Sequence, residues 1–219
     1  MMPDCAITPA KLGALRERVR EEMSAERFCH VLAVEQTAKE MAELYCPQDV
    51  DVVCAAALLH DVTKELSTEQ HLAILRDYDI EPTKDMISAP ATLHAVTAAL
   101  VIPERYPELC DEDIISAVRY HTTGRADMTL IEKIIYLADY IEPTRKYEGC
   151  KRLRNLFFGT QPQNMSDVDR ARHLDEVILE SLELTLEHLK DKNGAISSDT
   201  KKAREYLARQ LKDKTNGEK

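Results

Sequence analysis

The sequence predicts an all-α protein, and three observations support this class. Apolar residues recur with helical periodicity along most of the 219 residues. Only six glycines and no tryptophan are present, which leaves little material for a turn-rich β-sandwich or a glycine-rich nucleotide loop. Hydrophobic residues make up 44% and charged residues 31% of the chain, which is typical of a folded globular protein rather than a disordered one.

Helices are predicted from the N-terminus onward. Thr8 is a good N-cap and Pro9 suits the first helical position, so the first helix should begin there and extend to Met23. The helix over 50–61 is apolar on all sides, which predicts a central, buried position. The other helices predicted before Pro143 span 27–45, 68–78, 92–102, 111–121 and 129–142.

The character of the chain changes after Pro143. Residues 144–167 mix basic residues with Gly, Pro and Asn, which predicts an irregular segment with one short helix. An amphipathic helix over 175–190 and a last helix over 197–211 should follow. The apolar stripe of the first of these two helices consists of Ile178, Leu182, Leu186 and Leu189.

These patterns predict one core domain with an appendage. We expect a helical core over 1–143, an irregular segment and C-terminal helices packed on it over 144–212, and a disordered tail over 213–219. The exposed face of the 175–190 helix would allow a homodimer.

Charge and cysteine content exclude several classes of partner. The 29 basic and 39 acidic residues give a net charge of 29 − 39 = −10, which argues against non-specific binding to nucleic acid. No apolar run is long enough to cross a bilayer, and no signal peptide is recognisable. The six cysteines form no CxxC pair and should be reduced thiols packed as small hydrophobic residues. We expect a cytoplasmic protein with no nucleic-acid or membrane partner.

Several polar residues interrupt apolar helices. His60 and Asp61 end the most apolar segment of the chain, His30 lies on the apolar face of its helix, and Asp139 interrupts another buried helix. A metal ion would satisfy these four together, because imidazole and carboxylate groups suit divalent iron, manganese or zinc. Two further histidines, His94 and His121, also lie in or at the end of core helices, whereas His71, His173 and His188 are expected at the surface.

Basic and hydroxyl residues accompany these candidates. Lys64 lies one helical turn beyond His60, and it is either a surface lysine or a partner for an anion bound at the metal. Thr122, Thr123 and Gly124 form a polar turn before Arg125, which is either an ordinary interhelical loop or a phosphate cradle.

The ordered set His30, His60-Asp61, His94, His121 and Asp139 resembles the signature of HD-domain metal-dependent phosphohydrolases. The segments "RFCH", "LLHDVTK", "RYHTTGR", "MTLIEKIIYLADYIEPTR" and "ISSDT" are similar to those of the YqeK family within that superfamily. Its members are symmetrical bis(5'-nucleosyl)-tetraphosphatases, which cut diadenosine tetraphosphate into two ADP molecules.

The resemblance implies an HD-domain helical bundle with additional C-terminal helices. It also implies a divalent metal, iron first with manganese and zinc as alternatives, held by His30, His60, Asp61 and Asp139. The residues it implies for catalysis are Asp61, Lys64, His94 and His121. The residues it implies around the dinucleoside polyphosphate or ADP are Arg27, His94, His121, Thr122, Thr123, Arg125, Asp139 and Arg145.

Three features depart from the family pattern: "HAVTAA" after His94, Asp127 in place of a common glycine, and a longer segment from Phe157 to Asp169. Other functions therefore stay open, namely hydrolysis of another nucleotide and nucleotide binding without turnover. A purely structural metal site is the last alternative.

Overall fold

The computed structural model describes residues 7–217, and the side chains of 7–213 within them. Eleven α-helices and four short 3-10 helices make up this range, which contains no strand. The all-α prediction is confirmed. The first helix, α1 (Pro9–Glu22), begins as predicted, because the Thr8 hydroxyl accepts a hydrogen bond from the Lys11 backbone N–H at 3.3 Å.

Helix α3 (Val50–Leu59) lies at the centre of the fold. Every residue from Val53 to Leu59 is at most 2% exposed, as its uniformly apolar sequence predicts. Helices α1, α2 (Ala25–Tyr45), α7 (Glu112–Tyr120) and α8 (Leu130–Ile141) pack around it. Because α3 is enclosed, a polar residue at its C-terminal end must find its partners inside the protein.

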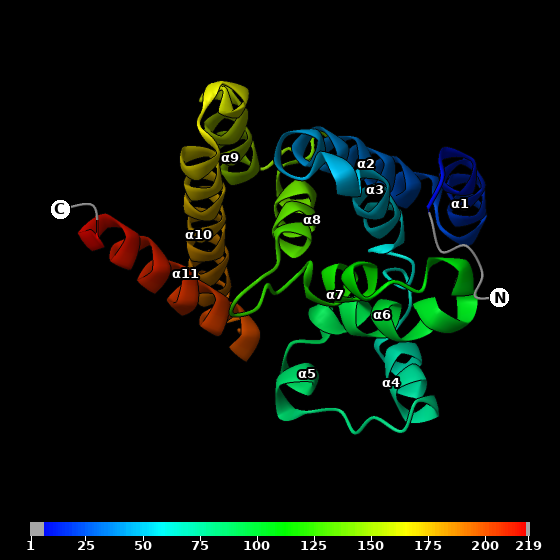
Figure 1. The fold of residues 1–219 in the computed structure, drawn as a ribbon. Coiled ribbons are helices and arrows are strands. Elements are labelled where there is room, and N and C mark those ends of the chain that lie inside the picture. The colour runs from blue at the N-terminus through cyan, green and yellow to red at the C-terminus, as the bar shows by residue number, and fades with distance from the viewer. Residues whose placement is uncertain (1–6, 218–219) are drawn as a thin grey trace.

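A small lobe lies beside this core. It consists of α4 (Thr68–Asp77), α5 (Lys84–Ser88) and η2 (Pro90–Thr92), which lead into α6 (Leu93–Arg105). Its buried apolar residues, Leu75, Leu93 and Val96, form a cluster separate from the main core. In Figure 1, α4 and α5 lie at the bottom of the view, below α6 and α7.

The C-terminal helices α9 (Glu148–Gly159), α10 (Asp167–Asp191) and α11 (Ser198–Gly217) lie together on one side of α8 (Figure 1). Helix α10 begins at Asp167, within the predicted irregular region, because Ser166 caps it by accepting the Asp169 N–H at 3.1 Å. Helix α11 continues to Gly217, into the segment predicted as a disordered tail, and residues 218–219 lie outside the described range.

The longer segment from Phe157 to Asp169 packs at the C-terminal end of α2. Arg170 donates hydrogen bonds to Leu44 O at 2.5 Å and to Pro162 O at 3.1 Å. His30 is near the other end of α2, about 20 Å away at 1.5 Å per residue. This segment therefore does not wall the candidate site.

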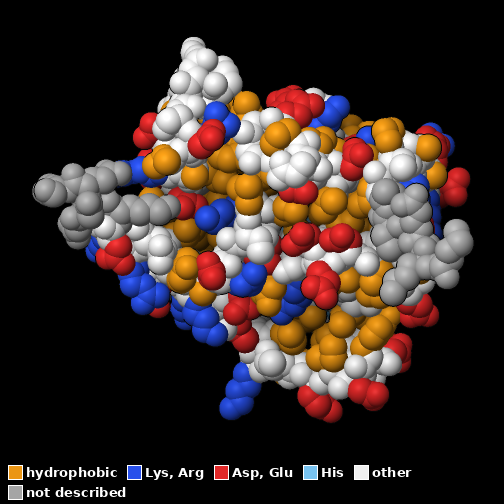
Figure 2. Space-filling view, viewed as in Figure 1, with side chains coloured by type: hydrophobic (Ala, Val, Ile, Leu, Met, Phe, Trp, Pro, Cys, Tyr) orange, Lys and Arg blue, Asp and Glu red, His pale blue; other side chains and the backbone are white. Residues whose placement is uncertain are grey.

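Acidic and basic side chains are interspersed over the face in Figure 2, with Lys and Arg gathered along the edge that α11 occupies. No described helix is both long and apolar enough to span a membrane. The described cysteines are free thiols, of which Cys46, Cys54 and Cys150 are buried and Cys29 and Cys110 are exposed. Cys5 lies outside the described residues.

Candidate active site

Five helices bring the candidate residues to one place. His60 and Asp61 follow the last residue of α3, and His121 directly follows α7. His30 lies in the second turn of α2, His94 opens α6, and Asp139 is in the last turn of α8. Segments up to about a hundred residues apart in the chain therefore meet at the end of the buried helix α3.

Asp61 is the centre of this cluster and is only 3% exposed. Its Oδ2 atom lies 3.3 Å from His60 Nε2, 3.7 Å from His30 Nε2 and 2.9 Å from Arg27 Nη1. Its Oδ1 atom lies 3.5 Å from His94 Nε2 and 3.7 Å from His121 Nε2. One carboxylate thus faces four imidazole nitrogens.

The imidazole rings are oriented by hydrogen bonds on their other nitrogen. His60 Nδ1 donates to Ala57 O at 2.6 Å, His121 Nδ1 to Val118 O at 2.7 Å, and His94 Nδ1 to Ala91 O at 2.9 Å. Each acceptor is the carbonyl three residues earlier. With the proton assigned to Nδ1 by these acceptors, each Nε2 keeps its lone pair directed into the cluster.

The pKa shifts of His94, His121 and Asp139 agree with this assignment, and that of His30 does not. Burial lowers the pKa of His30, but Asp139 and Glu142 more than offset this effect and raise the pKa to about 9, so a cation must displace a proton from this ring. Burial and the neighbouring His60 lower the pKa of His121 to about 4. Burial, together with the nearby His121 and Lys64, holds the pKa of His94 well below its usual value. Burial alone would raise the pKa of Asp139, but Arg145 and His30 more than offset it and bring that pKa well below its usual value. Neutral imidazoles and ionised carboxylates are the forms that bind metal.

A divalent cation fits this donor set. His30 Nε2, His60 Nε2 and Asp61 Oδ1 are buried without a hydrogen-bond partner among the described residues, which would be costly in a site that bound nothing. His30 Nε2 lies 3.0 Å from Asp139 Oδ1 without hydrogen-bond alignment, as expected of two ligands of one ion. Two groups have donor atoms within 4.8 Å of one another: His30, His60, Asp139 and His60, Asp61, His121.

Cations and hydroxyls line the rim of the cluster. Lys64 Nζ donates to His94 Nε2 at 3.1 Å, so Lys64 points inward rather than into solvent. The Thr122 hydroxyl lies 3.0 Å from both His94 Nε2 and His121 Nε2. Arg145 pairs with Asp139 at 2.5 Å. The Nε atom of Arg27 is buried without a hydrogen-bond partner, which leaves a donor for an anion.

Two predicted phosphate ligands have other partners in this structure. The Thr123 hydroxyl donates to Gly124 O at 2.9 Å. Arg125 donates from Nε to the buried Glu132 at 2.9 Å. Their roles toward phosphate stay predictions.

Glu142 is a buried residue of the site that the sequence reasoning missed. Its Oε1 accepts from His30 Nδ1 at 3.1 Å and from the Thr144 hydroxyl at 2.6 Å. This contact fixes the tautomer of His30, with Nε2 facing the cluster. The signal was present in the sequence, because Glu142 follows Asp139 by three residues and so shares its helical face.

Two histidines predicted at the surface are buried, so those predictions were wrong. His71 is 5% exposed and its Nδ1 lies 2.8 Å from the Thr97 hydroxyl. His173 is 8% exposed and its Nε2 lies 2.9 Å from the Thr160 hydroxyl. In both cases a hydroxyl from another segment, Thr97 of α6 or Thr160 directly after α9, satisfies the ring. His188 is exposed, as predicted.

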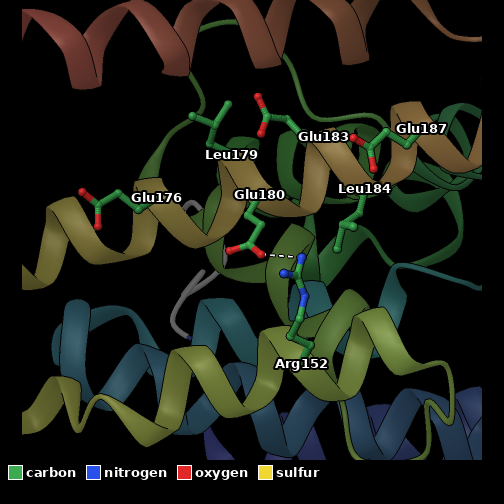
Figure 3. Close-up of a pocket in the computed structure, with 7 residues that line it drawn as sticks. All are labelled: Arg152, Glu176, Leu179, Glu180, Glu183, Leu184 and Glu187. Carbon is green, nitrogen blue, oxygen red and sulfur yellow. Dashed lines mark ion pairs between the residues drawn. The ribbon is translucent and has the colours of Figure 1, made fainter.

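The larger hollows of the surface lie elsewhere. One of about 400 Å³ runs along α10, where Glu176, Glu180, Glu183 and Glu187 surround Leu179 and Leu184, with Arg152 of α9 opposite (Figure 3). This hollow has carboxylates as its main polar groups and would repel a polyanion.

The residues that surround Asp61 belong to a known domain. The family model of the HD domain matches residues 27–144, more than half of the chain. The chain therefore belongs to the HD-domain family, as its sequence pattern predicts, and it is an HD-superfamily hydrolase whose His/Asp cluster indicates a divalent metal site.

Its relatives narrow the family further. The chain is 33% identical over 182 residues to the symmetrical bis(5'-nucleosyl)-tetraphosphatase of Bacillus subtilis, covering 83% of this chain and 89% of the relative. The enzyme of the same name from Halalkalibacterium halodurans is 32% identical, with 86% and 92% covered.

A solved structure shows the same fold. A crystal structure from Clostridium acetobutylicum, of a predicted HD superfamily hydrolase involved in NAD metabolism, matches with a TM-score of 0.78 and 30% identity. The match covers 90% of this chain and 97% of the other. The HD fold with C-terminal helices is thus confirmed.

Proposed function

We propose that this protein hydrolyses diadenosine tetraphosphate symmetrically to two ADP molecules. The observation that carries the proposal is the Asp61 carboxylate, which is buried among four imidazole Nε2 atoms and paired with Arg27. Two further cations contact its neighbours, Lys64 at His94 and Arg145 at Asp139. The relatives named as symmetrical tetraphosphatases, similar over more than four fifths of the chain, support the choice of substrate.

In this proposal His30, His60, Asp61 and Asp139 hold the cation. A divalent ion supplies Lewis-acid chemistry when bound, because it withdraws electron density from phosphoryl oxygens and lowers the pKa of water. Iron is the metal we propose, with manganese and zinc as alternatives, since imidazole and carboxylate suit all three. Elemental analysis of protein purified without added metal tests this choice.

The residues of the chain then have separate roles. Water attacks one of the two central phosphorus atoms, and the bond to the oxygen that bridges them breaks. In this proposal Asp61 accepts the proton of the attacking water. His94 or His121, whose Nε2 carries no proton at rest, first takes one up there and then passes it to the departing ADP oxygen. Lys64 and the arginines offset the charge that develops on the phosphoryl oxygens. An acidic protein can therefore hold a polyanion, because the attraction is local.

The products test the proposal. Purified protein supplied with iron or manganese should convert diadenosine tetraphosphate to ADP alone. Ion-exchange chromatography of the reaction mixture identifies the products. AMP with ATP as products would contradict it. Turnover of nucleoside monophosphates or guanosine tetraphosphate, but not of diadenosine tetraphosphate, would support a hydrolase of another nucleotide. Tight ADP binding without turnover with any metal would support a nucleotide-binding regulator.

A further inference from the structure

A hollow of about 270 Å³ lies next to the site and shares two of its residues, Lys64 and His94. The rest of its lining comes from the turn after α3, from α4 and from η2. These residues are Leu66, Thr68, His71, Pro90 and Ala91.

The lining has the composition of a ligand pocket. Leu66, Pro90 and Ala91 supply apolar surface, and Thr68 and His71 supply polar groups. The His71 ring is fixed, because its Nδ1 bonds to Thr97 at 2.8 Å. Thr97 in turn contacts the Thr63 hydroxyl at 2.9 Å, so the wall is tied to the turn that carries Asp61 and Lys64.

The small lobe gives this wall its own support. Leu75 of α4, with Leu93 and Val96 of α6, forms a buried cluster separate from the main core. Pro90 and Ala91 are exposed and line the hollow, so their side chains are accessible to a ligand. The lobe therefore places apolar side chains, together with Thr68 and His71, beside Lys64.

We propose that this hollow binds the nucleoside of one half of the substrate, an inference that rests on the proposed function. A nucleotide has a polyanionic end and a base and sugar with both apolar surface and hydrogen-bonding groups. The hollow joins Lys64 and His94 to the apolar side chains of Leu66, Pro90 and Ala91 and to the polar groups of Thr68 and His71. Pockets that enclose a whole drug-sized ligand measure about 300–1,000 Å³, so 270 Å³ suits one nucleoside rather than the dinucleotide.

The larger hollows do not compete for this role. The hollow of about 400 Å³ in Figure 3 has four glutamates in its lining. A second hollow, of about 450 Å³, lies between α10 and α11 and is lined by Glu183, Leu186, Glu187, Lys190, Lys201, Arg204 and Glu205. Neither shares a residue with the Asp61 cluster. Of these three hollows, the one of about 270 Å³ is the one that joins apolar side chains to residues of the cluster.

Binding of two probes to the metal-loaded protein tests the proposal. Ala91→Phe fills the hollow from an exposed position, and Thr68→Phe fills it from the opposite segment. Ala171→Phe, on an exposed position of α10, is the matched control. Calorimetry measures the affinity for ADP and for inorganic pyrophosphate, which lacks the nucleoside.

We expect both hollow variants to weaken ADP binding roughly 10- to 100-fold, because the added phenyl group displaces the nucleoside and its burial of apolar surface is lost. The affinity for pyrophosphate and the metal content should not change. If ADP affinity is unchanged in both variants and the wild type hydrolyses diadenosine tetraphosphate, the nucleoside site is overturned and the proposed function is not. Equal losses for both probes also overturn it, because the variants would then act on the phosphate groups. A wild type that neither hydrolyses the dinucleotide nor binds ADP overturns the proposed function itself.

Discussion

Two regions of this molecule gather carboxylates, and they differ in how those carboxylates are satisfied. On α10, Glu180 pairs with Arg152 at 2.5 Å and stays 31% exposed, and Glu183 pairs with Arg204 at 2.9 Å and stays 45% exposed. At the end of α3, Asp61 is 3% exposed and one of its oxygens has no hydrogen-bond partner among the described residues. The number of acidic groups is thus a poor guide to a site.

The difference has a physical basis. Exposed ion pairs cost little to form and contribute about 0–1 kcal/mol, so they accumulate on solvated faces without function. A buried carboxylate or imidazole without a partner costs about 1–3 kcal/mol or more, and a fold keeps several together only when a ligand satisfies them. The α10 hollow therefore has the character of a solvated face, and the Asp61 cluster that of a metal site.

The largest expected effect comes from exchanging a carboxylate for its amide in each region. Asp61→Asn should lower turnover of diadenosine tetraphosphate at least about 1,000-fold, because Asp61 is the proposed metal ligand and proton acceptor and the amide is neutral. Glu180→Gln, on α10, should leave turnover within about twofold. Initial rates and circular dichroism of both variants check this. A folded Asp61→Asn protein with near-normal rates would put the active site elsewhere.

Glu142 gives a smaller effect that separates positioning from ligation. Glu142→Ala removes the acceptor for His30 Nδ1, and losing such a partner lowers metal affinity about 10- to 100-fold. Glu142→Gln retains an acceptor oxygen and should recover most of that affinity. Titration with Co²⁺, followed by its visible absorption, measures both. Equal affinity in wild type and the folded Ala variant would show that Glu142 only fills space.

Removal of the metal should change stability moderately. A cation present at about 100 times its dissociation constant adds roughly 2.7 kcal/mol, which for a chain of this size corresponds to a Tm shift of roughly 5–10 °C. Chelation should lower the Tm by that amount and leave the far-ultraviolet circular dichroism at 20 °C unchanged. Complete unfolding on chelation would instead identify a structural metal site.

The sequence predicts the site better than it predicts the chain's surface. His60 and Asp61 end a helix that is apolar on all sides, so their burial follows from their neighbours alone. His71 follows Glu69 and Gln70, and His173 follows Arg172, so both have polar settings in sequence. Their burial depends on the hydroxyls of Thr97 and Thr160. Such partners come from other helices, and periodicity along one segment does not reveal them.

Helix boundaries show the same limit. The first helix could be predicted from Thr8 and Pro9, because an N-cap and a proline act within one turn. The N-terminal turns of α10 were missed, although Ser166 and Asp169 have cap spacing, because the Pro and Asn residues before them favour an irregular segment. Local signals compete at such places, and contacts such as Arg170 with Leu44 decide between them.

The departure at Asp127 also becomes clear only in three dimensions. Its backbone has φ 55°, in the left-handed region that glycine adopts without strain, which explains the glycine common at this position in the family. Aspartate tolerates this conformation better than most residues. Its carboxylate accepts a hydrogen bond from the Tyr206 hydroxyl of α11 at 2.8 Å, so the added negative charge has a hydrogen-bond donor at the surface.

The smallest predicted effect tests whether α11 belongs to the site or only covers it. Tyr206→Phe removes one exposed hydrogen bond to Asp127 and should lower the free energy of unfolding by about 0.5–1 kcal/mol, measured by urea denaturation. Turnover should stay within about twofold, because Tyr206 touches the turn after Arg125 and not the cluster. A clear loss of kcat/KM at full stability would mean that α11 holds the Thr122–Arg125 turn in its active geometry. An exposed, satisfied hydrogen bond would then contribute to activity, and the surface could not be separated from the Asp61 cluster as sharply as the distances around Asp61 indicate.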